Sequence, residues 1–482
     1  MLPPLRSHQE YLQFVDNHLA GIKVVPFHHE AVYPMMKQLD LTSLRPVVAS
    51  DYSLTRGRPA TPPEDMLRSF ALMQACKVVS IDDWVAMMRS ISYYAVLSGF
   101  DPKHVPGVGT FFDFEARLTG MKPQEHIQKP RTKKQDTQGQ SKDKNADTPK
   151  HQGIILKLSH HIQKHPHHMN FTDLEQRINS ILKTCAVNHS ITLGLIDLNN
   201  LRVAGDSTKL STWANPHGHK LCSCKEKCSC LRWFKDPKAR WGYDSYRNCF
   251  VYGHTLYELT AYSLQHSTQL PLSLCLTDNR RHDSVIGLLL LHKTIDSLKY
   301  PIKTATLDKA HDALGYYSLQ HFWNLNMVIP LNERNSGHLT YTPALNQDGH
   351  PICPANLPFR PWGFCPDRAR FKWRCPTLSR IPPKPCPLPT PCSPAPYGRT
   401  VYTYPKTNPR LFTPIPRNSP LWKTHENFRS CAERSVKRKK EDFVLDYMRT
   451  GSFYRWSFRS LVAALNQHAF AWTNYSSRDS PT

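Results

Sequence analysis

Long hydrophobic runs are missing from this sequence of 482 residues. No stretch approaches the roughly 18 to 20 consecutive apolar residues that a membrane-spanning helix needs, and the longest candidate covers only residues 286–291. The first twenty residues carry a charged or polar side chain every few positions and lack the apolar region of a secretory signal. We therefore expect no membrane span and a cytoplasmic location, where the 14 cysteines stay reduced.

Acidic residues are scarce relative to basic ones. The 38 Asp and Glu face 62 Lys and Arg, which leaves a formal net charge of +24. Such an excess favours a polyanionic partner, because neutralised phosphates release counterions, although a merely basic surface is the simpler alternative. The 40% hydrophobic content, with 10 Trp, 20 Tyr and 20 Phe, excludes wholesale disorder, and the length predicts two to four domains.

Composition divides the chain into five segments. They are an all-α domain at 1–118, a flexible basic linker at 119–152, the first part of an α/β core at 153–350 with a Cys-rich loop at 213–240, a Cys- and Pro-rich insertion at 351–420, and the last part of the core at 421–482.

Helix start signals organise the first segment. Residues 61–64 (Thr-Pro-Pro-Glu) form a capping-box pattern that predicts a helix over about 62–76, and Ser80 begins a second start signal before another apolar stripe. Two helices joined in this way indicate either a helix-turn-helix or a plain helical hairpin. Neither helix is especially basic, so we leave both open, and the domain is our candidate for recognising DNA ends.

Strand and helix patterns then alternate in the core. Strands are predicted at 195–200, 201–209, 249–263, 269–276, 304–307 and 327–330, and helices at 284–298, 309–323, 425–447 and about 456–470. This order is typical of a mixed-sheet α/β fold.

Three carboxylates stand at positions suited to divalent cations. Asp206 and Asp308 follow apolar strand segments, and Glu433 lies on a predicted late helix. Oxygen ligands from neighbouring strands and a packed helix are what a Mg²⁺ site requires, and two such ions catalyse phosphoryl displacement. A helix-capping role is the alternative for either Asp, and a solvated salt-bridged helix is the alternative for Glu433.

Cations flank Glu433 at helical spacing. Arg429 lies four residues before it, Lys437 four after and Lys440 seven after. A carboxylate among fixed cations is suited to lie beside both metal and phosphate.

These residues resemble the DDE transposases of bacterial insertion sequences. The family signature is a Tyr, two residues, an Arg, three residues, a Glu, six residues and a Lys. Arg429, Glu433 and Lys440 match these spacings, whereas Glu426 occupies the Tyr position.

Further motifs extend the resemblance. Residues 205–208 (Gly-Asp-Ser-Thr) look like the first-Asp motif of the family, and residues 307–312 look like the second. Lys309 and Ala310 differ from the residues that usually follow the second Asp in the family. Asp312 therefore remains an alternative to Asp308 as the second catalytic Asp. Dispersed similarities cover most of residues 55–118 and 200–460.

The resemblance implies an RNase H-like mixed sheet flanked by helices, with the insertion before the last catalytic helix. It implies metal-dependent cleavage of double-stranded DNA at terminal inverted repeats, then 3′-hydroxyl strand transfer into target DNA by a homodimer or multimer on the bacterial nucleoid. The implied residues are the Mg²⁺ or Mn²⁺ ligands Asp206, Asp308 and Glu433 and the DNA-contacting cations Arg429, Lys440, Lys437 and Arg434.

Cysteine clusters suggest structural zinc. The first cluster consists of Cys222, Cys224, Cys228 and Cys230, in which His217 or His219 could replace one thiol; free thiols in a basic loop are the alternative. A second, wider set in the insertion consists of Cys353, Cys365, Cys375 and Cys386, with Cys392 as a spare.

Two other functions stay open at this point. One is a metal-dependent DNA nuclease that only hydrolyses. The other is a non-catalytic or domesticated transposase-derived DNA-binding protein.

Overall fold

The computed structural model describes residues 1–22, 25–27, 29–53, 57–121, 128–129, 153–225, 228–244, 247–332 and 344–479. Most of the predicted linker at 119–152 therefore lies outside the described residues. No helix in the described ranges is both long and apolar enough to cross a membrane.

The N-terminal part is helical, as predicted. Its α-helices are α1 (His8–Leu19), α2 (His29–Gln38), α3 (Arg45–Val48), α4 (Pro63–Ala75), α5 (Ile81–Ser90), α6 (Ser92–Ser98) and α7 (Val108–Thr119). Helix α4 is the central one, because every residue from Pro63 to Gln74 is buried. Ser80 caps α5 by accepting a hydrogen bond from the Asp83 amide at 3.3 Å, which confirms that start signal.

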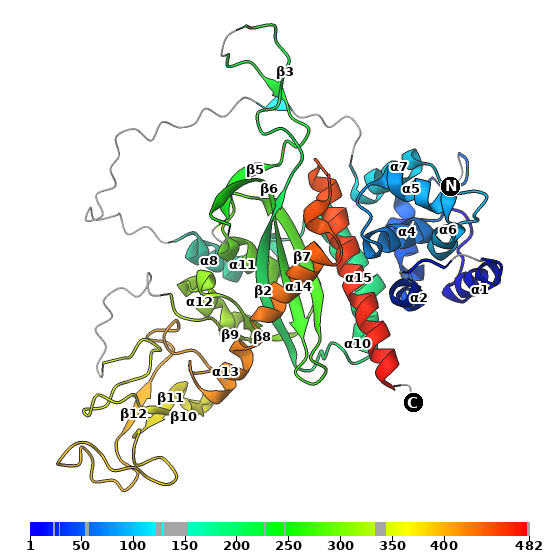
Figure 1. Ribbon diagram of the computed structural model, residues 1–482. Helices are drawn as coiled ribbons and strands as arrows, with labels where there is room; N and C mark the ends of the chain where they lie inside the picture. The colour runs from blue at the N-terminus through cyan, green and yellow to red at the C-terminus, as the bar shows by residue number, and fades with distance from the viewer. Residues whose placement is uncertain are drawn as a thin grey trace.

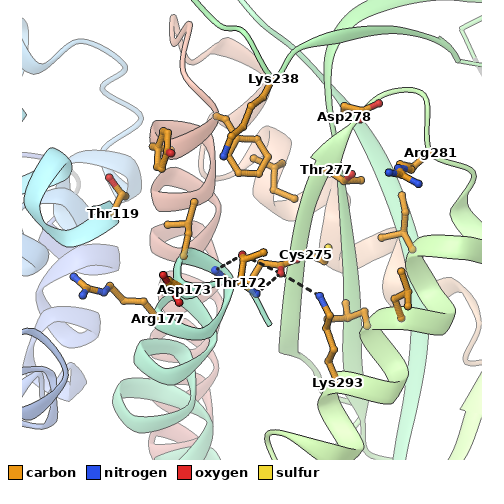
Figure 2. A pocket seen from close by; sticks show the side chains of 18 of the residues that line it. Thr119, Thr172, Asp173, Arg177, Lys238, Cys275, Thr277, Asp278, Arg281 and Lys293 are labelled. Carbon is orange, nitrogen blue, oxygen red and sulfur yellow. Dashed lines mark hydrogen bonds and ion pairs between the residues drawn. The ribbon is translucent and has the colours of Figure 1, made fainter. Parts of the chain in front are cut away.

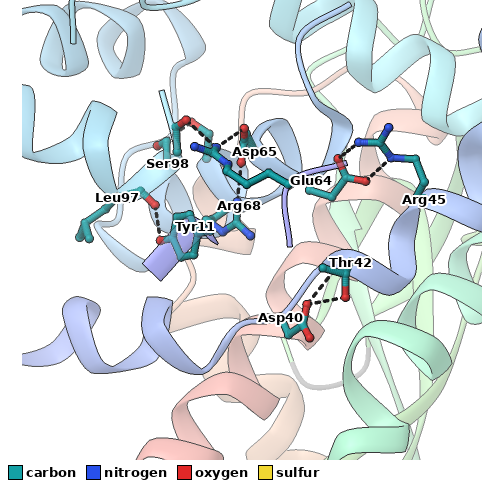
Figure 3. Close-up of polar contacts among 12 residues, drawn as sticks. Tyr11, Asp40, Thr42, Arg45, Glu64, Asp65, Arg68, Leu97 and Ser98 are labelled. Carbon is teal, nitrogen blue, oxygen red and sulfur yellow. Dashed lines mark hydrogen bonds and ion pairs between the residues drawn. The ribbon is translucent and has the colours of Figure 1, made fainter. Parts of the chain in front are cut away.

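The capping box predicted at residues 61–64 is not formed. The N-cap of α4 is Pro62 and makes no side-chain cap. Figure 3 shows that the Glu64 carboxylate instead accepts two hydrogen bonds from the Arg45 guanidinium, at 2.7 and 2.9 Å. The neighbouring Asp65 accepts from Arg68 of the same helix at 2.6 Å and also pairs with Arg6, so the start of this buried helix is held by both local and long-range charge pairs.

The second part is built on one mixed sheet of six strands. They are β2 (Leu201–Ser211), β5 (Arg240–Asp244), β6 (Cys249–Tyr262), β7 (Gln269–Asp278), β8 (Ile302–Thr306) and β9 (Asn326–Val328). The strand order is β5-β6-β2-β8-β9, with β7 also paired to β6. Strands β5, β2 and β7 run antiparallel to β6, whereas β8 and β9 run parallel to β2. The structure confirms the mixed α/β class, but residues 195–200 form turns instead of a strand.

Helices cover both faces of this sheet (Figure 1). Those in the sheet-bearing part are α8 (Ile154–Lys164), α9 (Asp173–Leu182), α10 (Asn188–Thr192), α11 (Asp283–Asp296), α12 (Leu314–Phe322), α13 (Pro420–Glu426), α14 (Ser430–Glu441) and α15 (Phe453–Asp479). The predicted helix over 425–447 is thus divided between α13 and α14, because Ser419 and Pro420 begin a separate short helix. The predicted last helix over 456–470 extends to 453–479.

Helix α15 joins the N-terminal helices to the sheet (Figure 1). On one side the Asn466 amide donates to the Ala71 carbonyl of α4 at 2.9 Å. On the other side His468 Nε2 donates to the Pro271 carbonyl of β7 at 2.8 Å. Apolar residues from both parts form one continuous core, so the N-terminal helices are anchored to the sheet.

The Pro-rich insertion folds as a small unit of its own. An antiparallel sheet of β10 (Arg360–Cys365), β11 (Arg370–Arg374) and β12 (Thr400–Thr403) packs over a separate apolar cluster that includes Phe371 and Trp373. In Figure 1 this unit lies beside α13, away from the N-terminal helices.

Two short ladders complete the described structure. Strand β4 (Arg232–Trp233) lies between β1 (Gln128–Lys129) and β3 (His219–Lys220), next to the first cysteine cluster.

Candidate functional site

Asp206 and Asp308 occupy equivalent positions on neighbouring parallel strands. The last parallel pair of β2 and β8 joins Ala204 to Thr306, and each Asp lies two residues further along its strand direction. Neighbouring strands lie about 4.8 Å apart, so the two carboxylates belong to the same edge of the sheet. Strand β2 continues past Asp206 to Ser211, so only Asp308 follows the end of its strand as predicted.

The two faces of the sheet at this edge have different neighbours. Asp206 is paired across the strands with Glu258 of β6, whose side chain contacts α14. Tyr257 points the opposite way, toward α11, where its hydroxyl lies 2.8 Å from His311 Nε2. The side chain of Asp206 therefore lies on the α14 face, the face that also carries Glu433.

Electrostatics join the three predicted carboxylates. The pKa of Asp206 is raised to about 7, chiefly by burial and also by the negative charges of Asp308 and Glu433, while a backbone hydrogen bond with Ser207 acts against this rise. The negative charge of Asp283, the first residue of α11, also raises the pKa of Asp206. Asp283 lies just before the helix predicted over 284–298, and its contribution to this negative centre depends on how α11 packs beside β2 and β6.

Asp308 is held in place by its own loop. Its carboxylate accepts from the Ala310 amide at 3.2 Å and from the Nδ1–H of buried His311. Burial raises the pKa of Asp308, but the His311 hydrogen bond and charge outweigh it and leave the pKa below the usual value. His311 Nε2 accepts from the Tyr257 hydroxyl, so a hydrogen-bonded chain runs from Asp308 into the α11 face.

Asp312 has a structural environment. Arg410 donates to its two oxygens at 3.0 and 2.6 Å, the Tyr317 hydroxyl donates at 2.8 Å, and the Asn332 amide donates at 2.7 Å. Since these donors occupy both carboxylate oxygens of a buried residue, the geometry favours Asp308 over Asp312 as a metal ligand.

Glu433 and Arg429 form an ion pair at the start of α14. Both side chains are partly exposed, at 47% and 38%. Arg429 also lowers the pKa of Asp308 through its charge, so this guanidinium lies among the carboxylates.

The other predicted DNA-contacting cations have protein partners. Lys440 pairs with Asp446 at 3.0 Å, and Lys437 lies 3.7 Å from Glu441. Arg434 reaches Gln269 of β7 at 3.2 Å. Among the four, only Arg429 is tied by these contacts to the carboxylates.

A buried charge pair fixes α14 against the sheet. Lys439 and Glu258 are both fully buried and form an ion pair, and Gln467 of α15 accepts from Lys439 at 2.6 Å. Ser435 donates to Glu258 from one turn earlier in α14. The sequence did not indicate Lys439 or Glu258 as buried residues. Residues 434–440 are mostly basic, and a helix of that composition is expected to face solvent.

A match to known proteins falls on the N-terminal helices. Residues 22–117, from before α2 to the last turn of α7, match the family model described as a transposase domain (DUF772). The chain carries a transposase-family domain. This match ends before the first of the three predicted carboxylates. A comparison with curated proteins gives no match.

A cavity of about 870 Å³ lies beside strand β7 (Figure 2). It is lined by residues of α9, β7, α11 and α15, by Pro237, Lys238 and Arg240, and by the C-terminal end of α7, so its lining lies outside residues 22–117. Lys293 pairs there with Glu175 at 3.1 Å, and Lys238 Nζ lies 4.4 Å from the ring centre of Phe453. None of the three predicted carboxylates lines it, so this cavity is distinct from the sheet-edge site.

The first cysteine cluster is assembled. The thiols of Cys222, Cys224, Cys228 and Cys230 all lie within 4.8 Å of one another. The Cys222 and Cys228 sulfurs are 3.4 Å apart and those of Cys224 and Cys230 are 3.9 Å apart. A tetrahedral Zn²⁺ with Zn–S bonds near 2.3 Å requires sulfurs about 3.8 Å apart, so this set fits a structural zinc. Neither His217 nor His219 belongs to the group.

One thiol of this cluster is already acidified. A hydrogen bond from the Cys224 backbone and a second from the Cys228 thiol lower the pKa of Cys222 to about 7. Hydrogen bonds within the cluster raise the pKa of Cys230 to about 12 and also raise that of Cys224, so Cys222 is the thiol that ionises first.

Proposed function

We propose that this chain is a DDE transposase that cleaves DNA at the ends of a mobile element and joins those ends to target DNA. The observation that carries the proposal is the equivalent position of Asp206 and Asp308 on adjacent parallel strands, with Glu433 close enough to raise the pKa of Asp206. The transposase-family domain at residues 22–117 supports the same class.

The sheet supports an RNase H-like core. Three strands in the order β7-β6-β2 are antiparallel and are followed by the parallel strands β8 and β9. In that arrangement the two Asp come from β2 and the end of β8, and the Glu comes from α14, as the family resemblance implies.

The donor set fits hard divalent cations. Asp206, Asp308 and Glu433 supply carboxylate oxygens, and their mutual repulsion is offset by one nearby guanidinium, that of Arg429. These three residues would hold Mg²⁺ or Mn²⁺, which when bound activates the attacking oxygen and stabilises the leaving one.

The remaining residues position the reacting groups. His311 and the Ala310 amide orient Asp308, while the Glu258–Lys439 pair holds the helix that bears Glu433. Arg429 would contact the phosphate. In cleavage, a water oxygen attacks phosphorus and the 3′-oxygen leaves as a hydroxyl. In joining, that hydroxyl attacks a target phosphate and displaces the target 3′-oxygen, so no covalent enzyme intermediate forms.

Cleavage of a duplex carrying the element's terminal repeat tests the catalytic site. We expect nicking with Mg²⁺ or Mn²⁺ and joining of a pre-cut 3′-hydroxyl end, both lost in Asp206→Asn. The matched control is Asp197→Asn, which changes an Asp in a turn before β2. Equal nicking by wild type and Asp206→Asn would refute the site, and nicking without joining would identify a nuclease instead. Binding without nicking in every metal would identify a non-catalytic DNA-binding protein.

Assembly and zinc belong to the same proposal. Transposition brings two element ends together, so we propose a homodimer or multimer on DNA in the bacterial cytoplasm. The first cysteine cluster would hold one structural Zn²⁺ beside the β3–β4 ladder. The zinc content of wild type should exceed that of the Cys222→Ser/Cys228→Ser variant by one ion per chain. Equal zinc contents would refute this zinc site.

A further inference from the structure

The outer face of the β10–β11–β12 sheet is strongly basic. Residues 351–420 contain eleven Lys and Arg and one acidic residue, Asp367, so the insertion carries +10 of the chain's +24. Asp367 lies 3.6 Å from Arg368, which neutralises it locally.

Strand β11 separates charge from apolar side chains. Phe371 and Trp373 point into the apolar cluster of the insertion, and each is 2% exposed. Residues of a strand alternate between faces, so Arg370, Lys372 and Arg374 share the opposite face at intervals of about 7 Å. We call these three residues the basic face.

Aromatic rings support the two arginines of the basic face. The Arg370 guanidinium lies 3.8 Å from the ring centre of Tyr402, and the Arg374 guanidinium lies 4.0 Å from that of Trp362. The two rings are 36% and 46% exposed. Stacking of this kind orients guanidinium groups without neutralising them.

The positive charge of the basic face is not neutralised by a carboxylate in the described ranges. Within the described ranges none of the three basic-face residues forms an ion pair, and the Nε atoms of both arginines have no hydrogen-bond partner. Arg370 has a side-chain hydrogen bond with Tyr404, but no carboxylate neutralises any of these three partly exposed cations in the described ranges.

We propose that the basic face binds the phosphate backbone of DNA. Phosphate contacts give affinity without sequence preference, and arginine is suited to bidentate phosphate contacts. Arg410 connects the base of this unit to Asp312, four residues after Asp308, so DNA held here would lie beside the sheet-edge site. This inference rests on the proposed function in taking DNA as the ligand.

The test measures binding without catalysis. A full-length chain carrying Asp206→Asn is titrated in EDTA against a fluorescent 30-base-pair duplex over a range of salt concentrations. The face variant adds Arg370→Gln, Lys372→Gln and Arg374→Gln. The matched control adds Lys157→Gln, Lys164→Gln and Lys303→Gln, three exposed lysines on α8 and at the start of β8.

Each lost phosphate contact lowers the slope of log affinity against log salt by about 1. We expect the face variant to show a slope shallower by about 3 and at least about tenfold weaker binding, with the control unchanged. An Arg370→Lys/Arg374→Lys variant should keep the slope. Unchanged binding by the face variant, with normal circular dichroism, would overturn this inference and would indicate another partner.

The two proposals fail in different ways. Normal binding with no cleavage by the chain that retains Asp206 would overturn catalysis and leave the basic face intact. Normal binding by the face variant, together with normal cleavage by a chain that has the three face substitutions and retains Asp206, would overturn the basic face alone.

Four cysteines of the same unit carry a second, independent inference. Cys353, Cys375, Cys386 and Cys392 line one small cavity of about 10 Å³, roughly the size of one water-sized particle. Cys365, on β10, is not among its lining residues. The wider set indicated by the sequence had Cys365 as a member and Cys392 as the spare, whereas this cavity is lined by Cys392 and not by Cys365.

The Cys375 side chain is held in a fixed position. Its sulfur lies 3.3 Å from the Thr377 hydroxyl, and the residue is buried. Gly398 packs against the same cysteine so closely that a Cβ would lie 2.9 Å from its sulfur. This loop is therefore shaped around the Cys375 side chain.

We infer that these four cysteines bind a structural Zn²⁺. Their sulfurs are not yet as close as those of the first cluster, since no three of them lie within 4.8 Å of one another. Cys392 is exposed and Cys386 is partly exposed, so metal binding would draw their loop inward over buried Cys353 and Cys375. The ion would close a segment rich in proline that has little regular structure to hold it.

Zinc content per chain tests this site. Expression with ample zinc should give two ions in wild type, one in Cys392→Ser and two in the matched control Cys365→Ser. Cys392→Ser removes an exposed side chain, so its folding is secure. Equal zinc in Cys392→Ser and wild type would overturn the site. Loss of four titratable thiols without metal would show that they form disulfides instead, which would also overturn it.

Discussion

Arg410 and Asp312 form a buried bidentate ion pair that joins the Pro-rich insertion to the loop after Asp308. The Asp312 side chain is fully buried and that of Arg410 is 11% exposed. Arg417 adds to this junction by donating to the Ile329 carbonyl at 3.2 Å and to the Tyr317 hydroxyl at 3.0 Å, so the position of the insertion relative to the predicted catalytic edge depends on buried arginines far along the chain.

Arg410→Ala should destabilise the chain by about 3 to 5 kcal/mol, because it leaves the Asp312 carboxylate buried without its cation. Urea unfolding followed by tryptophan fluorescence measures the change. Lys406→Ala, at an exposed position in the same segment, should have an effect below about 0.5 kcal/mol. Similar effects of the two substitutions would contradict a role for this ion pair.

Glu258→Ala should destabilise the chain by a similar amount and weaken DNA cleavage. Lys439 would be left charged and fully buried, and α14 would lose the contact that holds Glu433 near Asp206. The double variant Glu258→Leu/Lys439→Met should recover most of the stability, because no buried charge remains. Urea unfolding measures the change in stability, and a cleavage assay measures the change in activity. A double variant no more stable than Glu258→Ala would rule out a buried unpaired charge as the cause.

Gly205→Ala should disturb the site from the α11 face of the sheet. A Cβ at this position would lie 2.6 Å from the Tyr257 hydroxyl and 2.7 Å from Leu307. Overpacking of this kind costs about 1 to 3 kcal/mol, and here it acts next to Asp206. Removing the hydroxyl in Gly205→Ala/Tyr257→Phe should restore part of both stability and cleavage. If the double variant were no more stable and no more active than Gly205→Ala, the clash would not be with the Tyr257 hydroxyl.

Acidification should destabilise the chain through His468. Burial lowers the pKa of this histidine to about 3, and its ring donates to the Pro271 carbonyl and accepts from Ser190. The unfolded chain binds a proton near pH 6.5 and the folded chain does not, so stability is lost as the pH falls below about 6.5.

At pH 5 the loss from this group should reach about 2 kcal/mol. His468→Gln keeps a donor but cannot titrate, so its stability should fall less between pH 7.5 and pH 5 than that of wild type. Unfolding curves at both pH values give the comparison. Parallel losses in the two proteins would show that His468 does not titrate in this way.

Part of the molecule followed from local patterns. Apolar periodicity indicated the helices over 62–76 and 284–298, a start signal indicated the Ser80 cap, and a high content of β-branched, aromatic and Leu residues indicated the long strands β6 and β7. These features depend on contacts within one element or on burial of one stripe, and adjacent residues encode both. The thiols of the first cysteine cluster all lie within a segment of nine residues, so their spacing also predicted their convergence.

Other features depended on partners far along the chain. The Glu64 capping box was wrong because Arg45 binds that carboxylate, and the helix over 425–447 was divided because Ser419 and Pro420 begin a separate helix. Cys392 lines the cavity of the insertion in place of Cys365 because β10 carries Cys365 elsewhere.

The amino-acid order alone determined the basic charge, the absence of long apolar runs and the positions of the acids at 206, 308 and 433. Only the tertiary structure decided that the first two lie in register, that Asp283 adds to their negative field, and that Asp312 is bound by an arginine from the insertion. Parallel pairing and buried charge join residues a hundred positions apart, and their free energy depends on burial, which local sequence does not specify.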